Sequence, residues 1–279
     1  MSLISSFKSD ADELLEREFL ANGYIIRDVA ARDTLDSIRD AIVSIACEII
    51  SVDPVTIEPG KFLDLIHERV SVEMLNEFRM TIFGRLNAMA ELRPSYFSLG
   101  QQVLESIVGN ELAMQNQVNL SIQMPGDSSS LLRMHSDSLS GETPYQVVQW
   151  LPIVDVYDTK SMYILPPEHN REVFPNLVSM TDDLGLDGVF AAVRDRVKWL
   201  NVPYGKVLVF SPNLLHGNIV NETSETRWSM NSRLTGLFTP YTSSEQNLGT
   251  FYLPITTKPA SRIGMNFTSP LNFDVVDKR

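Results

Sequence analysis

Residues 204–218, YGKVLVFSPNLLHGN, carry the pattern that decides the fold. A run of β-branched and aromatic residues predicts a strand over 207–210, and Pro212 predicts a turn directly after it. His216 follows that turn, immediately before a glycine. The strand therefore delivers a histidine to a position where residues from elsewhere in the chain could join it.

Similar β-rich runs lie on both sides of this stretch, bounded by Pro, Gly, Asp and Asn. They predict strands within 116–124, 145–156, 161–166 and 226–238. Towards the N-terminus, apolar residues recur instead at helical spacing. The predicted helices are 10–23, with Asp10 as its cap and Gly23 as its stop, then 32–50, 67–92, 99–109 and, among the strands, 183–200.

Helices followed by strands, without regular βα alternation, predict an α+β fold. We expect packed N-terminal helices against an antiparallel sandwich or jelly roll. No linker or repeat marks a boundary, so we expect one domain over 1–279. It would comprise a mainly helical support region to about residue 112, a jelly-roll core over 113–240 and a C-terminal extension over 241–279.

Composition bounds the function. The chain has 279 residues, of which 43% are hydrophobic, enough for a sizeable core. Its net charge of −12 argues against a nucleic-acid or anionic-membrane surface. The first residues lack a signal-peptide pattern and no apolar run approaches ~20 residues, which predicts a cytoplasmic protein. Cys47 is the single cysteine, which excludes a disulfide framework. We expect it to lie on a helix and to be buried in the hydrophobic core.

A second histidine lies in RMHSDSLSG, residues 133–141. His135 and Asp137 are two positions apart, a spacing that puts both side chains on one face of a strand. With His216 they form H-x-D and, about 80 residues later, H. Two imidazoles and one carboxylate can occupy one face of an octahedral iron and leave three positions open. The alternative is a strand-capping His135, a turn at Asp137 and an unrelated loop histidine.

Polar residues alternate along ETRWSMNSR, 225–233. On a strand they share one face, opposite Trp228 and Met230. A guanidinium flanked by a hydroxyl, as at Arg227 and Ser229, can clamp a carboxylate with two hydrogen bonds. The alternative is a row of polar residues on an exposed strand face.

The combination of H-x-D…H, R-x-S and GKVLVFSPxLLHG resembles the Fe(II)/2-oxoglutarate-dependent oxygenases, and within them the phytanoyl-CoA hydroxylase-like group. EREFLANGYIIRDV is similar to that group's opening helix, glycine and first strand. SMYILPPEHN resembles its I-P-G-S-H turn, with Pro and Glu in place of Gly and Ser. The resemblance runs from about residue 14 to about residue 238. Residues 135–166 are most similar to a branch found in carbohydrate and aminoglycoside biosynthesis clusters.

The resemblance implies a cupin-like double-stranded β-helix (jelly roll) with Fe(II), 2-oxoglutarate and O₂ as cofactors. It assigns iron binding to His135, Asp137 and His216. Related halogenases have a small residue at the position of Asp137, so this chain resembles the oxygenases. Arg227, helped by Ser229, would bind the distal carboxylate of 2-oxoglutarate. Succinate and CO₂ would be released. Hydroxylation is the default outcome, with alcohol oxidation, desaturation and epimerisation as alternatives.

Other residues are secondary candidates. Gln123 and Gln149 are expected to face the inside of the jelly roll and contact the cosubstrate. Arg233, Lys160 and Arg133 could meet an anionic substrate or be solvated surface groups. Trp150 is expected in the core. The remaining histidines, His67 and His169, are expected to be structural or solvated.

The substrate implied by the resemblance is a small polar metabolite, preferably a carbohydrate or a nucleotide-activated sugar. The competing interpretation is a cupin-like, metal-dependent sugar isomerase or sugar-binding protein without redox chemistry, which gives Arg227 and Ser229 no particular role. The N-terminal helices could either brace the sheet or form a homodimer contact.

Overall fold

The computed structural model describes residues 8–54 and 57–268. Most α-helices precede most strands along the chain, but one strand lies between the first two helices, two α-helices are inserted among the later strands, and one follows the last strand. The helices are α1 (Asp10–Asn22), α2 (Arg32–Ile50), α3 (Pro59–Asp64), α4 (Val72–Asn87), α5 (Leu92–Ser98), α6 (Gln101–Ile107), α7 (Pro167–Val173), α8 (Leu177–Val193) and α9 (Pro259–Met265). Short 3₁₀ helices are η2 (Ile66–Glu68), η3 (Asp137–Ser140), η4 (Asp158–Lys160) and η5 (Phe174–Asn176).

Two antiparallel sheets form the centre of the molecule. The larger has the strand order β1-β7-β4-β9-β2-β10, with β3 also paired to β9, and the smaller has the order β6-β5-β8. The strands are β1 (Tyr24–Asp28), β2 (Leu112–Gln115), β3 (Asn119–Gln123), β4 (Gln146–Pro152), β5 (Tyr163–Ile164), β6 (Lys198–Trp199), β7 (Lys206–Phe210), β8 (His216–Gly217), β9 (Arg227–Gly236) and β10 (Tyr252–Thr256). The mixture of helices with antiparallel sheet confirms the coarse α+β prediction.

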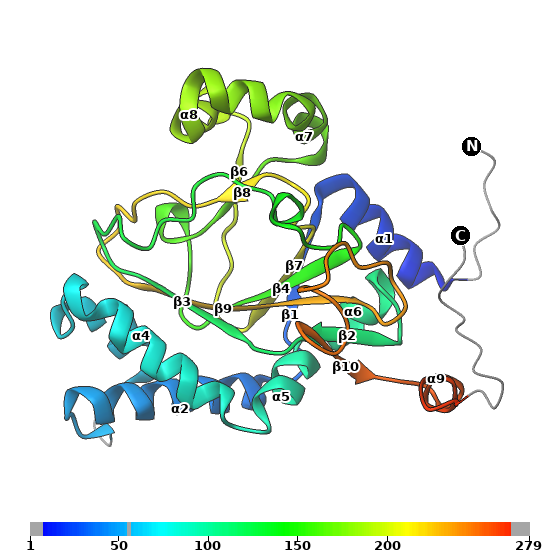
Figure 1. Cartoon of the computed structure of the whole chain (residues 1–279). Coiled ribbons are helices and arrows are strands. Elements are labelled where there is room, and N and C mark those ends of the chain that lie inside the picture. Colours follow the sequence, from blue (N-terminus) through cyan, green and yellow to red (C-terminus); the bar gives the residue numbers. More distant parts are fainter. Residues whose placement is uncertain (1–7, 55–56, 269–279) are drawn as a thin grey trace.

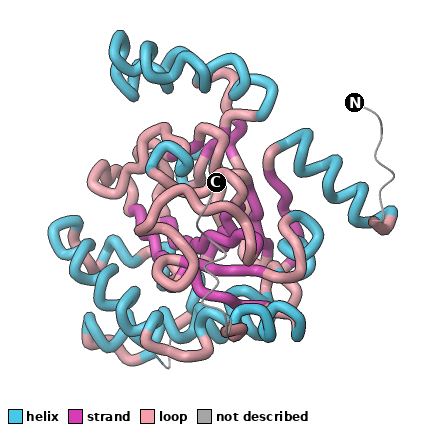
Figure 2. Tube along the Cα trace, turned by 45° about the vertical axis from the view of Figure 1, so that its right-hand side comes forward, coloured by secondary structure: helices cyan, strands magenta, loops and turns pink. Residues whose placement is uncertain are grey.

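The layers follow from this order. Helices α2, α4 and α5 lie along one side of the larger sheet, whereas α7 and α8 project beyond the smaller sheet on the other side (Figure 1). Turning the molecule by 45° keeps the strands between these two groups of helices (Figure 2). Strand β4 is consequently buried along its whole length. Because both faces of β4 are covered, its sequence QVVQWLP does not alternate between an apolar and a polar face.

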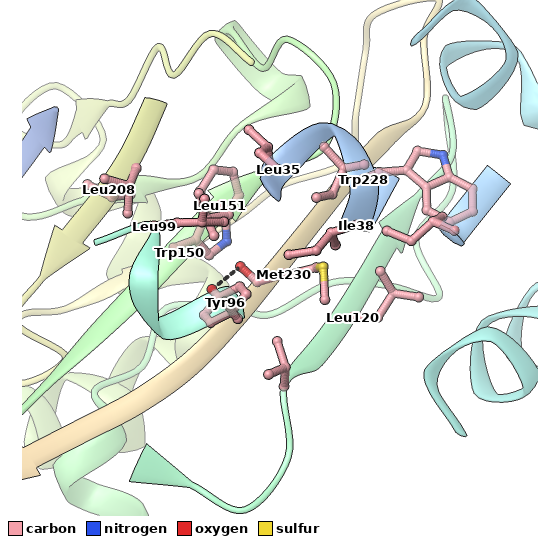
Figure 3. Packing of buried hydrophobic residues seen from close by; sticks show 14 of the residues in the cluster. Leu35, Ile38, Tyr96, Leu99, Leu120, Trp150, Leu151, Leu208, Trp228 and Met230 are labelled. Carbon is pink, nitrogen blue, oxygen red and sulfur yellow. Dashed lines mark hydrogen bonds between the residues drawn. The ribbon is translucent and has the colours of Figure 1, made fainter. Parts of the chain in front are cut away.

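One apolar cluster joins the N-terminal helices to the larger sheet. Figure 3 shows Leu35 and Ile38 of α2 and Tyr96 of α5 against the outward side chains of β9. The buried Tyr96 hydroxyl donates to the carbonyls of Gln149 (2.8 Å) and Met230 (3.1 Å), on two neighbouring strands. This helical region therefore shares its core with the sheet, and β1 within it adds a strand to that sheet.

Most predicted elements are present, with differences that have physical causes. The helix predicted over 67–92 is divided into η2, α4 and α5. Helix α8 begins earlier than predicted and is kinked at Gly185, and β6 follows where the prediction continued the helix. Strands β2 and β10 were not predicted: β2 is short and wholly buried, and β10 contains Pro254, which its edge position and the irregular pairing at that residue accommodate.

The first helix ends at a position that requires glycine. Gly23 has φ 77° and its amide donates to the Phe19 carbonyl, an αL cap. A Cβ at this position would lie 2.1 Å from Leu214 Cδ1, beside the turn that leads to His216. The predicted stop at Gly23 is confirmed, but the N-cap is Ser9, whose hydroxyl accepts from Asp12 N, and not Asp10.

Cys47 is fully buried in α2, as predicted. Within the described ranges, no helix combines the length and apolar character that crossing a membrane requires.

Replacing Tyr96 with Phe is expected to lower the free energy of unfolding by about 1–3 kcal/mol, because two buried carbonyls lose their donor. Urea unfolding monitored by circular dichroism measures this change. Tyr145→Phe serves as the control, since the Tyr145 side chain is 60% exposed. Equal stability of the two variants would contradict a structural role for the Tyr96 hydroxyl.

Candidate metal centre

A pair of backbone hydrogen bonds brings the two candidate histidines together. His135 N donates to His216 O (3.0 Å) and His216 N donates to His135 O (2.9 Å). This antiparallel bridge adds the H-x-D segment beside β8 of the smaller sheet. The two histidines therefore lie on neighbouring extended segments of the same sheet.

Asp137 lies where this short extended segment turns into η3. Its amide donates to the Pro212 carbonyl (3.0 Å), and the Ser136 hydroxyl also lies 3.2 Å from that carbonyl. The segment is thus tied to the proline turn that precedes His216. Gly217 permits the close approach, because a Cβ there would lie 2.7 Å from the Leu132 carbonyl oxygen.

The three side chains converge through one atom each. Asp137 Oδ1 lies 3.3 Å from His135 Nε2 and 3.8 Å from His216 Nε2. The three possible ligand atoms all lie within 4.8 Å of one another, so His135, Asp137 and His216 could hold a metal ion. Two nitrogens and one oxygen at this separation are a donor set suited to iron, nickel or zinc.

The outer nitrogen of each imidazole is already engaged. His135 Nδ1 lies 2.7 Å from the Arg133 carbonyl and His216 Nδ1 lies 2.8 Å from the Leu214 carbonyl. A carbonyl oxygen only accepts, so each Nδ1 carries a proton and donates it. In its neutral form, each ring then has the lone pair of Nε2 facing the centre, the arrangement usual for metal-binding histidines.

The electrostatics of the three groups also suit a cation. Burial, followed by the nearby His135, lowers the pKa of His216 to about 4, so this ring is neutral at pH 7. Burial alone would raise the pKa of Asp137, but the His135 hydrogen bond and the charge of Arg233 outweigh it and leave the pKa at about 2. For His135, burial lowers the pKa, but the hydrogen bonds to Asp137 and to the Arg133 carbonyl outweigh it and raise the pKa, so this ring takes up a second proton more readily than a free imidazole. A bound cation would displace that proton from Nε2, because a metal binds the neutral ring.

Arg227 and Ser229 of β9 provide a second polar feature. Both side chains are buried. Arg227 Nη1 donates to the Ser161 carbonyl (3.3 Å) and Nη2 to the Ser121 hydroxyl (3.1 Å), whereas Arg227 Nε and Ser229 Oγ have no partner. Burial lowers the pKa of Arg227 to about 10, so it remains charged at pH 7. Within residues 8–54 and 57–268, no carboxylate forms an ion pair with it.

One cavity joins these two features. It encloses about 90 Å³, well above the ~10–15 Å³ that a single water requires. The inward face of β9 contributes Arg227, Ser229, Asn231 and Arg233, which confirms the shared face that was predicted. The remaining lining residues are Ser121, Leu132, His135, Asp137, Val148, Trp150, Met162, Phe210, His216, Gly217 and Asn218.

The two glutamines behave differently. Gln123 lies on the inner face of β3, where its side-chain nitrogen donates to the Ile219 carbonyl (2.7 Å) and its oxygen accepts from Asn218 Nδ2 (3.2 Å). Gln123 therefore fixes the position of Asn218, which lines the cavity, but it does not line the cavity itself. The inward placement of Gln149 was wrong: Val148 and Trp150 line the cavity, whereas Gln149 Nε2 donates to the Tyr96 carbonyl on the helix side.

Three basic residues were candidates for an anionic substrate. Lys160 is fully buried and pairs with Asp64 (2.6 Å) and Glu225 (2.7 Å), so it is neither a surface group nor a cavity group. Arg133 is a surface residue that lies 3.5 Å from Asp187 of α8. Arg233 does line the cavity, and there it pairs with Asp137.

Residues of α3, next to the Lys160 ion pairs, hold the segment that carries Arg227. Thr226 N donates to the Asp64 carbonyl (2.7 Å) and Trp228 Nε1 donates to the Leu63 carbonyl (2.8 Å). The two residues that flank Arg227 are therefore tied to α3, Thr226 through its backbone and Trp228 through its indole. His67 contributes through a 2.9 Å contact between its Nδ1 and the Thr226 hydroxyl, which agrees with its expected structural role.

The other aromatic and histidine expectations are mixed. His169 is near the surface, 3.5 Å from Glu168. Trp150 belongs to the core cluster as predicted, yet it also forms part of the cavity wall. The sequence did not single out Met162 or Asn218, which line the cavity. Asn218 could have been found, since it stands two positions after His216, directly beyond β8.

Comparison with known proteins supports the fold. No protein-family model matches the sequence, and no curated protein matches it. Among solved structures, the apo form of the non-heme monooxygenase ThoJ superposes with a TM-score of 0.58 at 13% identity, covering 88% of this chain and 84% of that chain. HygX from Streptomyces hygroscopicus with nickel and 2-oxoglutarate bound gives 0.52 at 15% identity, covering 84% and 89%. At such identities the similarity shows a shared fold.

Asp137→Ala is expected to weaken binding of Ni(II), a probe for the site, by more than about 100-fold, since loss of an outer-sphere partner alone costs 10–100-fold. Isothermal titration of metal-free protein measures it. Asp187→Ala, an exposed carboxylate near the same segment, is the control and should bind normally. A folded Asp137→Ala protein with unchanged Ni(II) affinity would remove this residue from the site.

Proposed function

We propose that this protein is an Fe(II)- and 2-oxoglutarate-dependent dioxygenase with a single catalytic domain built on a double-stranded β-helix. His135, Asp137 and His216 would hold the iron. Arg227 and Ser229 would bind the distal carboxylate of 2-oxoglutarate. The reaction consumes O₂ and 2-oxoglutarate, releases succinate and CO₂, and hydroxylates or otherwise oxidises a small polar metabolite.

The observation that carries the proposal is a buried cation without a counter-ion in the wall of the cavity that also contains the candidate metal ligands. Burying a charge is costly unless it is paired. Arg227 Nε and Ser229 Oγ are free to donate to one carboxylate. A dicarboxylate that bridges Arg227 and the metal would satisfy both groups.

The residues present fit the proposed iron. Both imidazoles point Nε2 inward, and Asp137 is ionised. Iron and 2-oxoglutarate supply the oxidising chemistry when bound. The protein binds them, orients the substrate and excludes water. Arg227 fixes one end of the cosubstrate. Trp150, Met162 and Phe210 give the cavity an apolar wall that keeps water from the reacting groups.

For the substrate we propose a carbohydrate or a nucleotide-activated sugar. Ser121, Asn218 and Asn231 supply polar groups along the cavity, of the kind that pair with hydroxyls. The resemblance of residues 135–166 to carbohydrate and aminoglycoside pathway enzymes supports the same class. Hydroxylation, alcohol oxidation, desaturation and epimerisation all begin from the same arrangement of residues.

The competing function, a cupin-like sugar isomerase or sugar-binding protein, would use the same metal ligands. It leaves the charge of Arg227 without a purpose. The oxygenase proposal is favoured because it alone gives that buried cation a partner.

Arg227→Ala should raise the 2-oxoglutarate dissociation constant at least about tenfold, because a charged hydrogen bond worth about 1.5–3 kcal/mol is lost. Anaerobic titration of the Fe(II)-loaded protein gives the constant, and succinate release gives the turnover, which should fall close to zero. Iron affinity should stay unchanged. Normal cosubstrate binding by Arg227→Ala would refute the assignment and favour the cupin-like function.

A further inference from the structure

Arg233 joins Asp137 to a buried polar cluster at the end of the cavity away from Arg227 along β9. Its Nε lies 2.5 Å from Glu142 Oε2, and its Nη1 donates to Gln115 Oε1 (3.4 Å). Glu142 Oε2 also accepts from Gln146 Nε2 (2.5 Å), and Gln146 accepts from the Tyr252 hydroxyl. Glu142 is only 5% exposed, so this cluster belongs to the interior.

The two oxygens of Asp137 have different partners. Oδ1 faces the two histidines, at 3.3 Å and 3.8 Å from their Nε2 atoms. Oδ2 accepts from Arg233 twice, from Nε at 3.1 Å and from Nη2 at 2.8 Å. The guanidinium is planar and rigid, and both of its donors meet the same oxygen, so it holds Oδ2 in place apart from Oδ1.

This division has a consequence for metal coordination. A carboxylate can bind a metal through one oxygen or through both. With two imidazoles and one carboxylate oxygen, an octahedral metal keeps three positions open, whereas a carboxylate bound through both oxygens leaves two. A keto acid that chelates through two oxygens would then fill the site completely.

We propose that Arg233 is a positioning residue that withholds Oδ2 of Asp137 from the metal. It thereby keeps open the one coordination position that the three protein ligands and the two oxygens of the keto acid leave free. Glu142 assists through its ion pair with the same guanidinium. The inference rests on the proposed function, because it concerns the metal that His135, Asp137 and His216 would bind. It also gives Arg233 a role other than binding an anionic substrate.

A single substitution of Arg233 would change the charge of the site as well as its geometry. Removing Arg233 alone would leave two buried carboxylates unpaired and would itself attract a cation. The double variant Arg233→Gln with Glu142→Gln removes one positive and one negative charge, so the net charge of the cluster is preserved. Arg233→Lys is the second variant, which keeps the charge but loses the fork. Arg93→Gln is the control: this half-buried arginine donates to the Gln115 and Met114 carbonyls and touches neither carboxylate.

The experiment uses nitric oxide as a probe of the open position. Each protein is loaded anaerobically with Fe(II) and 2-oxoglutarate, and its visible absorption band reports the loading. Nitric oxide is then added stepwise, and its binding to the iron is measured by electron paramagnetic resonance. Wild type and Arg93→Gln should form the band and bind nitric oxide alike. The double variant should keep the band but need at least about tenfold more nitric oxide, an effect of the size known for outer-sphere changes. Arg233→Lys should lie in between.

Nitric oxide binding to the double variant at the wild-type concentration would overturn the proposal. So would loss of the band in folded variant protein, since Arg233 would then be needed for iron or cosubstrate binding itself. If the double variant does not fold, the shift in Arg233→Lys decides. Failure of the proposed function is distinguishable, because wild type would then show no iron-dependent band at all.

Discussion

The paired backbone hydrogen bonds between His135 and His216 are the constraint on which the candidate site depends. They join two segments about 80 residues apart and set both imidazoles side by side, with ring centroids 4.3 Å apart. Because backbone groups make this contact, the side chains stay free to turn Nε2 inward. The Pro212 turn and Gly217 allow the two segments to approach closely enough for Asp137 to complete the group.

Strand β9 then distributes polar and apolar residues between its two faces. Its outward residues Trp228 and Met230 pack against helices, while the inward row carries Arg227 at one end and Arg233 at the other. The two arginines differ in their partners. Arg233 pairs with carboxylates, whereas Arg227 has neutral partners and an unused donor. One end of the row therefore stabilises the candidate metal ligands, and the other carries an unpaired positive charge suited to an anion.

Local patterns in the sequence predicted much of this arrangement. The period-two alternation of 227–233 predicted which residues of β9 face inward, and H-x-D with a later histidine indicated the three residues that could hold a metal. Gln149 was misplaced because β4 is buried on both faces, so its sequence has no alternation from which to read an inner face. The pairing of Arg233 with Asp137 and of Lys160 with Asp64 joins residues about 96 positions apart, which spacing alone does not reveal.

The central claim is that the three ligands and Arg227 serve one metal and one keto acid. The most direct test adds Fe(II) to metal-free wild-type protein under anaerobic conditions, then 2-oxoglutarate, and records the visible spectrum. We expect a weak charge-transfer band that needs both additions and saturates with the cosubstrate. Stoichiometric iron binding without any band on adding 2-oxoglutarate would contradict the account and leave Arg227 as a buried charge without an assigned partner.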